Sequence, residues 1–336
     1  MLCPTPMALE AVALTPAPTS PAQRAFALSG RGLHGARVAL PCAHTLHGTR
    51  VVRLRALTAL LACVTLGGCD APSVEGLPER LADLRVPRAA RHVYAPRHPL
   101  WTNGADKVRA VVAPDGTRPD VDAVPPGTLF FKEITAGGVL VETRVIRITA
   151  DGPEYAAYVH VGGDPERAFR TTDVASREVA VEVDGEAFVH VVPSDTQCAM
   201  CHEAGAGPIL GFTALQLDTP LATLGVSEVD EAVVGYALGN CAHCHNGSGA
   251  PGASFDLRPA VFVAHTVDVP TAGSASAAGL RVVPGAPERS VLYRALVADH
   301  GVAPMPPLGV QRRDEAFAEV LAAWITALSP NEEETP

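Results

Sequence analysis

The stretch PSDTQCAMCH at residues 193–202 divides the chain into two parts of different character. Upstream of it, from Trp101 to Val192, runs rich in Val, Ile, Phe and Tyr alternate with turn residues, which is typical of β-strands. Downstream of it, apolar residues follow helical spacing and are separated by long loops. We therefore predict an α+β fold, with an N-terminal β-rich domain followed by a mainly α-helical domain.

Five upstream segments are expected to be strands. They are residues 129–134, 139–148, 155–161, 178–183 and 187–192. The dipeptides Gly137-Gly138 and Asp184-Gly185 stand between consecutive runs and are typical of tight hairpin turns. The sequence therefore predicts two β-hairpins in this part of the chain.

Three downstream segments are expected to be helices. They are residues 227–238, with Ser227 as the N-cap, 290–298 and 314–328. The last is the clearest, because its apolar residues fall on one helical stripe. These residues are Phe317, Val320, Leu321, Trp324, Ile325 and Leu328. The C-terminal part is therefore predicted to end in an amphipathic helix.

The motif Cys-x-x-Cys-His occurs twice, as CAMCH at 198–202 and as CAHCH at 241–245. Residues i and i+3 lie on one side of a helical turn, so the two thiols of a motif can add to the two vinyl groups of one haem. The histidine that follows can then reach the iron as the proximal ligand. The sequence predicts two covalently attached c-type haems. Their residues would be Cys198, Cys201 and His202 for the first haem, and Cys241, Cys244 and His245 for the second.

An export signal is expected at residues 53–69, which read RLRALTALLACVTLGGC. Two arginines precede an apolar run that is too short to span a membrane but suits a signal peptide. The final Leu-Gly-Gly-Cys resembles a bacterial lipobox, which implies that Cys69 is lipidated and becomes the first mature residue. Residues 1–50 show no clean periodicity, and we expect translation to begin near Val51 or Val52. A buried helix with a chance cysteine is the alternative.

Two other interpretations of the cysteine pairs remain open. Together the pairs can supply a four-thiolate zinc site, although the gap from Cys201 to Cys241 is long for a zinc ribbon and zinc needs no histidine after each pair. Either pair can also act as a thioredoxin-like dithiol. We favour haem because two such motifs follow an export signal, and this type of haem attachment takes place outside the cytoplasm.

Met305 is predicted to be the distal ligand of the second haem. It lies in the Pro-rich stretch APMPP at 303–307, after His245 and before the predicted C-terminal helix. A thioether ligand favours reduced iron, so His/Met ligation raises the reduction potential. The alternative is that Met305 fills a core.

The distal ligand of the first haem is less evident. Met200 lies inside the first motif, where it cannot easily turn back to the same iron, and the site can also be five-coordinate. Histidines are the other candidates, and His160 and His190 lead because they stand on predicted strands. The remaining histidines considered are His92 and His98, with His265 and His300 as weaker candidates, and His243, which is expected to face solvent or the neighbouring haem.

The organisation predicted for the whole chain has six segments. They are a leader at 1–50, a lipoprotein signal peptide at 51–69, a tether at 70–97, the β-rich domain at 98–193, the dihaem domain at 194–329 and a flexible acidic tail at 330–336. The chain has 26 Lys and Arg against 36 Asp and Glu, a net charge of -10. This acidic balance argues against nucleic acid as a partner and favours a basic one.

Seven segments of the chain carry a family resemblance. They are HPLWTNGADKVR at 98–109, GTLFFKEI at 127–134, VETRVIRI at 141–148, PSDTQCAMCH at 193–202, LGFTALQLD at 210–218, GNCAHCHNGSG at 239–249 and MPPLG at 305–309. With them the chain resembles a family of bacterial exported dihaem c-type cytochromes with a class I cytochrome c-like C-terminal domain. The resemblance implies a β-rich domain followed by a haem domain, on the periplasmic face of the inner or outer membrane. It also implies the four motif cysteines as attachment points, His202 and His245 as proximal ligands, and Met305 as distal ligand.

The function expected from these residues is electron transfer between redox proteins of the cell envelope, by a cytochrome held to the membrane through its lipid anchor. Haem carries the chemistry, and the protein sets potential, distance and docking surface. Two alternatives stay open. One is a dihaem peroxidase-like oxidoreductase, in which an open first haem activates peroxide. The other is an envelope binding or scaffold protein that uses its β domain.

Overall fold

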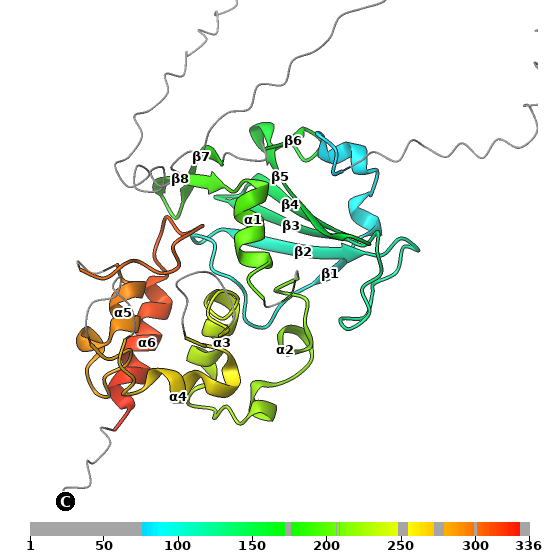
Figure 1. The fold of residues 1–336 in the computed structure, drawn as a ribbon. Coiled ribbons are helices and arrows are strands. Elements are labelled where there is room, and N and C mark those ends of the chain that lie inside the picture. The colour runs from blue at the N-terminus through cyan, green and yellow to red at the C-terminus, as the bar shows by residue number, and fades with distance from the viewer. Residues whose placement is uncertain are drawn as a thin grey trace, which may run out of the picture. The chain divides into compact units, whose positions relative to one another are not determined.

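The computed structural model describes residues 76–171, 176–205, 207, 209–247, 255–271, 279–298 and 301–329 (Figure 1). These residues all belong to one compact unit. The predicted leader at 1–50, the signal peptide with Cys69 and the tail at 330–336 lie outside the described residues. So does His300.

Six strands form one antiparallel sheet in which neighbours in the sequence are neighbours in space. They are β1 (His92–Tyr94), β2 (Asp106–Val112), β3 (Leu129–Ala136), β4 (Val139–Thr149), β5 (Gly152–His160) and β6 (Ala168–Arg170). A separate antiparallel hairpin consists of β7 (Arg177–Val183) and β8 (Glu186–Val192). Every connection within a sheet is thus local, which is the topology expected of a chain rich in hairpin turns.

The two faces of the six-stranded sheet are distinguished by the pairing register. Phe130 of β3 lies opposite Val111 of β2 and Ile146 of β4, so their side chains share one face. This first face also carries Tyr155, the partner of Ile146. The second face carries the alternate residues, and its core consists of Val112, Leu129, Phe131, Val145, Ala156 and Tyr158 with Leu77 and Leu81. Leu77 and Leu81 cover the second face, and Phe212 packs against Val111 and Phe130 on the first.

All five predicted strands are present, and both predicted turns are hairpin turns. Gly137, Gly138, Asp184 and Gly185 all have positive φ, as a type I′ turn requires. Strands β1 and β6 have three residues each and were not predicted, because such short runs give no alternation. Strand β2 was also missed, since Lys107 and Arg109 occupy positions that an ordinary strand would give to apolar side chains.

Residues 76–97 differ from the tether expected there. Leu77 and Leu81 are buried against the second face of the sheet, and β1 pairs with β2. Two 3₁₀ helices, η2 (Leu81–Leu84) and η3 (Arg88–Ala90), lead the chain into β1. Leu77 and Leu81, with Leu84 and Val86 packed beside them, are enough to fix this segment on the sheet, because burying their side chains removes apolar surface from water.

The chain after β8 is helical, as predicted. Its helices are α1 (Asp195–His202), α2 (Ala214–Leu217), α3 (Glu231–Asn240), α4 (Phe262–Thr266), α5 (Val291–Leu296) and α6 (Glu315–Ala327). Three 3₁₀ helices follow β8 as well, η5 (Leu221–Leu224), η6 (Pro259–Val261) and η7 (Pro287–Arg289), and a fourth, η4 (Val161–Gly163), lies earlier, between β5 and β6. Within the described ranges, no helix has the length and apolarity needed to cross a membrane. The coarse prediction of an α+β fold, strands first and helices later, is confirmed.

The helical part has its own core, in which α3 packs beside α6 (Figure 1). Val234 of α3 and Leu321 and Ile325 of α6 are almost fully buried there. Complete burial of one such side chain stabilises a fold by about 1.5–3 kcal/mol. Trp324 adds a hydrogen bond from its indole N–H to Asp230 Oδ1, at 2.8 Å. The apolar stripe predicted for the C-terminal helix is therefore the surface that joins it to α3.

Helix boundaries agree with the predictions at two of three places. Ser290 is the N-cap of α5, and Asp314 caps α6 by accepting from the backbone N–H of Phe317 at 3.0 Å. The helix predicted from Ser227 begins later, because Ser227 forms a turn with Asp230 and regular helix starts at Glu231. The competing serine side-chain bond accounts for this delay.

Candidate haem-attachment site

Both Cys-x-x-Cys-His motifs form helical turns. The first occupies the last five residues of α1, so Cys198 and Cys201 lie on one side of that helix. The second follows α3 directly, and the backbone N–H of His245 donates to the carbonyl oxygen of Cys241 at 2.9 Å. Each motif therefore has the local conformation in which two thiols and a histidine can serve one haem.

The start of α1 explains why the first motif is helical. The Ser194 hydroxyl accepts from the backbone N–H of Gln197, and the Gln197 side chain accepts from the backbone N–H of Ser194. This capping box satisfies two otherwise unpaired N–H groups. Asp195 forms an ion pair with Arg170 of β6, which ties the same turn to the sheet. The helix that carries the motif is thus fixed at its N-terminus.

The two motifs lie next to each other although many residues separate them in the sequence. The donor atoms of Cys201, His243 and Cys244 all lie within 4.8 Å of one another. The Asn246 amide donates to the carbonyl oxygen of Ala204 at 2.7 Å, which joins the residues following each motif. His243 is buried here, so the structure places it toward the first motif and away from solvent.

The four motif cysteines do not form one four-thiolate cluster. Cys198 and Cys241 lie outside the group made by Cys201, His243 and Cys244. Burial raises the pKa of Cys198 to about 11 and that of Cys241 to about 12. A hydrogen bond from Cys244, with His243 beside it, lowers the pKa of Cys201. Zinc ligation by all four thiols, one alternative from the sequence, is therefore not what this geometry offers.

The first motif lies against the first face of the sheet. The His202 ring is 5.5 Å from the ring of Tyr155, measured between centroids. The Cys198 thiol experiences the charges of Arg144 and Glu142 on β4. Figure 1 shows α1 against the sheet in this region. A group attached to the first motif would therefore contact β4 and β5.

A buried charged triad stands beside the first motif. Glu142 Oε1 accepts from Arg144 at 2.6 Å and from His190 Nε2 at 3.0 Å, and the Glu142 side chain is completely buried. Burial alone would raise the pKa of Glu142, but Arg144 and the hydrogen bond from His190 outweigh it and lower the pKa to about 2. The carboxylate thus fixes the tautomer and orientation of His190.

The candidate distal histidines of the first haem differ in their free nitrogens. His160 uses both, bonding Thr143 Oγ1 through Nε2 and the Asp164 carbonyl oxygen through Nδ1, each at 2.9 Å. His190 leaves Nδ1 without a hydrogen bond among the described residues. A metal-binding histidine ordinarily has one nitrogen held by a carboxylate or carbonyl and the other directed at the metal. His190 has one nitrogen held by a carboxylate and the other without a hydrogen bond, whereas both nitrogens of His160 are bonded.

His245, the predicted proximal ligand of the second haem, is enclosed by the helical part. Its ring lies 4.4 Å from the ring of Phe255, and the Arg281 guanidinium lies 4.3 Å above Phe255. Burial lowers the pKa of His245, which keeps the imidazole neutral, the form that binds metals. Its Nδ1 is buried without a hydrogen bond among the described residues. The donor set of each motif, two thiols and one imidazole, fits a c-type haem.

Met305 lies on the loop between α5 and α6. Its backbone N–H donates to the carbonyl oxygen of Ala295 at 3.0 Å, and its side chain is 42% exposed. Met200, in the first motif, is also exposed. A methionine that filled a core would be buried, so the exposure of Met305 argues against the core-filling alternative.

Residues 98–107 hold the two sides of the second motif together. The Trp101 backbone N–H donates to Asn240 Oδ1 at 2.7 Å, directly before Cys241, and the Trp101 indole donates to the carbonyl oxygen of Arg312 at 2.8 Å. Asn103 Oδ1 accepts from the backbone N–H groups of Gln311, at 2.7 Å, and Arg312, at 3.0 Å. One segment of the β-rich part thus positions both α3 and the loop of Met305.

Two glycines of α3 permit this close packing. A Cβ atom on Gly239 would come 2.2 Å from the His98 carbonyl oxygen, and one on Gly235 would come 2.2 Å from His98 Nδ1. Gln216 bonds the same His98 backbone from the other side, donating to its carbonyl oxygen and accepting from its N–H, both at 3.0 Å. His98 is therefore a packing residue at the helix preceding the second motif.

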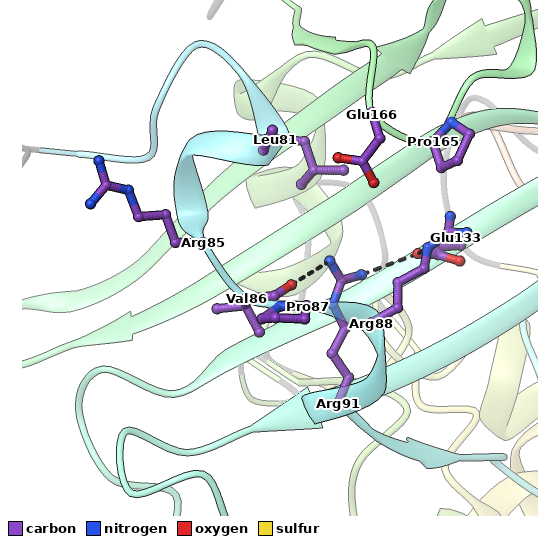
Figure 2. Close-up of a pocket in the computed structure, with 10 residues that line it drawn as sticks. Leu81, Arg85, Val86, Pro87, Arg88, Arg91, Glu133, Pro165 and Glu166 are labelled. Carbon is purple, nitrogen blue, oxygen red and sulfur yellow. Dashed lines mark hydrogen bonds and ion pairs between the residues drawn. The ribbon is translucent and has the colours of Figure 1, made fainter.

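A surface pocket lies away from both motifs. It has a volume of about 310 Å³ and is lined by residues of η2, η3 and β3 together with Pro165 and Glu166 (Figure 2). Arg88 and Arg91 pair there with Glu133 at 2.9 and 3.1 Å. Because Glu133 points to the second face of the sheet, opposite to the first motif, this pocket takes no part in the candidate site.

Sequence reasoning missed Glu142, Asn103 and the capping residues of α1. The Ser-x-x-Gln spacing at 194–197 was a usable signal for the cap. Glu142 and Asn103 gave no such signal, because a single polar residue in a strand or turn is ordinary until its partners are known. Comparison with protein-family models, with curated proteins and with solved structures finds no match.

Proposed function

We propose that this chain is a dihaem c-type cytochrome that transfers electrons between redox proteins of the cell envelope. The observation that carries the proposal is the pairing of the two motifs: each forms a helical turn, and Cys201 and Cys244 bring those turns together. A haem bound to each turn would place two redox centres side by side. When bound, haem supplies reversible one-electron chemistry.

The chain's own residues would set the properties of each centre. His202 and His245 supply the proximal nitrogens, while Met305 and His190 are the proposed distal ligands of the second and the first haem. Two filled axial positions favour electron transfer over reaction with peroxide. The C-terminal half is then class I cytochrome c-like, with α6 packed beside the helix that precedes the second motif.

The test is a count of haems in protein matured by a host competent for c-type haem assembly. We expect intact mass and pyridine haemochrome spectra to show two covalent haems per chain. Replacing Cys198 and Cys201 by alanine should leave one haem, as should the matched replacement of Cys241 and Cys244. A mature wild-type chain without covalent haem would refute the proposed function.

A second candidate function is supported by the Cys201, His243 and Cys244 cluster, which can bind a single transition metal such as zinc. A zinc protein would show metal by elemental analysis and no haem spectrum. Replacing His243 by alanine would then release the metal. In the dihaem protein, the same replacement should leave both haems attached, since attachment needs only the cysteines and the proximal histidine.

The distal ligands make a spectroscopic prediction. Met305→Ala should abolish the weak long-wavelength charge-transfer band of sulfur-ligated ferric haem and lower the potential of the second haem, with both haems still attached. His190→Ala should convert the first haem to high spin, and His160→Ala, its control, should not. Electron paramagnetic resonance distinguishes these spin states. A wild-type first haem that is already high spin and reacts with peroxide would instead support the peroxidase-like alternative.

Export and lipid anchoring at Cys69 form part of the same proposal. If Cys69 is acylated, the mature protein should partition into detergent, and Cys69→Ser should release it or leave it unprocessed. Phase separation followed by mass spectrometry of the N-terminal peptide measures both outcomes. A mature form that begins elsewhere and carries no lipid contradicts the anchor while leaving the haem count unaffected.

A further inference from the structure

A row of cations crosses the first face of the sheet. Arg109 of β2 lies opposite Lys132 of β3, which lies opposite Arg144 of β4. Lys107 stands two residues before Arg109 and therefore on the same face. Like charges directly opposite each other destabilise a sheet, so this basic row, Lys107, Arg109, Lys132 and Arg144, calls for a compensating anion.

The protein itself supplies little compensation within its described part. Glu142 neutralises Arg144, and Lys107 donates to the Leu100 carbonyl oxygen at 2.7 Å. No side-chain hydrogen bond or ion pair to described residues is found for Arg109 or Lys132. Burial, followed by the neighbouring arginines and Lys107, lowers the pKa of Lys132 well below its ordinary value, and burial also lowers that of Arg109.

The basic row faces the part of the chain that carries the first motif. Arg144 experiences the charges of both Cys198 and Cys201. At the other end, Arg109 Nε would lie 3.8 Å from a Cβ atom placed on Gly211. The row thus runs from beneath the first motif toward the loop that follows it. The charged and titratable groups around the row are Tyr94, Asp106, Glu142, His190, Cys198, Cys201 and Asp314.

We propose that Lys132 and Arg109, with Arg144 beside them, bind the propionate carboxylates of the haem attached at the first motif. The inference rests on the proposed function and adds to it a binding site for the acidic edge of one haem. Carboxylates match the row because arginine binds them bidentately and lysine supplies a compact charge. The basic row of the sheet would then bind the haem that is covalently attached to α1.

The two arginines of the pocket in Figure 2 differ from the basic row, because both pair with one carboxylate. Arg88 and Arg91 both contact Glu133, and Arg91 also donates to the carbonyl oxygen of Val86 at 3.1 Å. Among the described residues, neither Lys132 nor Arg109 forms an ion pair of this kind with a carboxylate. A free anion such as phosphate shares the chemistry of a propionate, so the experiment must separate the two sources.

The test compares Lys132→Met and Arg109→Met with the wild type, all as haem-loaded protein. A variant lacking Cys198 and Cys201 identifies the potential of the first haem. Spectroelectrochemical titration over a pH series should then show that each charge removal lowers this potential and makes it depend more steeply on pH, because an unpaired propionate protonates more readily. Arg147→Met is the control, since Arg147 is on β4 but on the opposite face, and it should change neither property.

Lys132→Arg should keep the wild-type potential and pH dependence of the first haem. This result would show that the positive charge at position 132 matters and that the shape of the lysine side chain does not. If both methionine variants fail to fold, resonance Raman spectra of the wild type decide: propionates bound to the row should keep their bands at a pH where exposed propionates protonate. Titration of those bands as for exposed groups would overturn the proposal. So would two haem-loaded methionine variants with unchanged potentials.

Added inorganic phosphate should leave the wild-type potential unchanged. A saturating shift with phosphate that disappears in Lys132→Met would assign the row to a free anion and overturn the propionate assignment. A wild-type chain with no haem removes both this inference and the proposed function. If the chain carries two haems but neither methionine replacement changes the potential of the first haem, only this inference is refuted.

Discussion

Replacing Glu142 by alanine is expected to lower the free energy of unfolding by about 3–5 kcal/mol, the loss that follows removal of one partner from a buried ion pair. Glu142 accepts from both Arg144 and His190 and has no exposed surface. Without it, Arg144 would lose its ion-pair partner while remaining opposite Lys132. Urea unfolding of the haem-loaded protein, followed by circular dichroism, measures the change.

Glu154→Ala is the matched control for Glu142→Ala. Glu154 lies on β5 and pairs with Arg147 of β4, but the two side chains are 35% and 24% exposed. An ion pair this accessible contributes at most about 1 kcal/mol. Adding Arg144→Met to Glu142→Ala should recover part of the loss, since the two residues interact directly. Equal costs for the two glutamate replacements would show that the buried triad does not stabilise the fold.

Replacing Asn103 by alanine is expected to cost about 2–4 kcal/mol and to disturb the second haem without detaching it. The side chain makes four hydrogen bonds to residues 309–312, and each contributes about 0.5–1.5 kcal/mol, with more lost when a buried partner stays unpaired. Because residues 309–312 follow Met305 closely, the loop between α5 and α6 should become more mobile. Weakening of the sulfur charge-transfer band then reports the effect on the ligand.

Asn103→Gly distinguishes the effect of backbone strain from the effect of losing the side-chain hydrogen bonds. Asn103 has a φ of 55°, which glycine adopts freely and alanine does not. Glycine should therefore be slightly less damaging than alanine and should weaken the band to the same degree. Thr102→Val is a neighbouring control, since Thr102 is buried but makes one long bond of 3.5 Å. If Asn103→Ala keeps the wild-type sulfur charge-transfer band, the hydrogen bonds of Asn103 do not position Met305.

The strand prediction succeeded where a strand contains enough residues to show its period. Strands β3, β4 and β5 pair in sequence order, so locating the strands in the sequence also predicts which strand lies beside which. Strand β2 was missed for a physical reason that bears on function, since its inward positions hold Lys107 and Arg109. A sequence pattern identifies an inward face by its apolar residues, and this one is charged.

In the candidate site, too, some residues could be predicted from the sequence and others could not. Six motif residues could be located from spacing alone, because thiols and histidine at fixed offsets describe one helical turn. The partners of those residues could not, since Glu142, His190 and Asn103 come from strands and turns distant in the sequence. Nor could spacing choose between His160 and His190, which both stand on predicted strands. Their hydrogen bonds distinguish them, and hydrogen bonds depend on three-dimensional neighbours.

The sequence by itself determined that strands come first and helices later, and it located the two Cys-x-x-Cys-His motifs, because periodicity and motif spacing are local properties of a chain. Only the tertiary structure decided that the two motifs are adjacent, that residues 76–97 cover the sheet, and that Arg109, Lys132 and Arg144 stand in one row. These facts depend on strand register and on which surfaces bury one another. Such pairings join residues far apart in the sequence, and no local pattern encodes them.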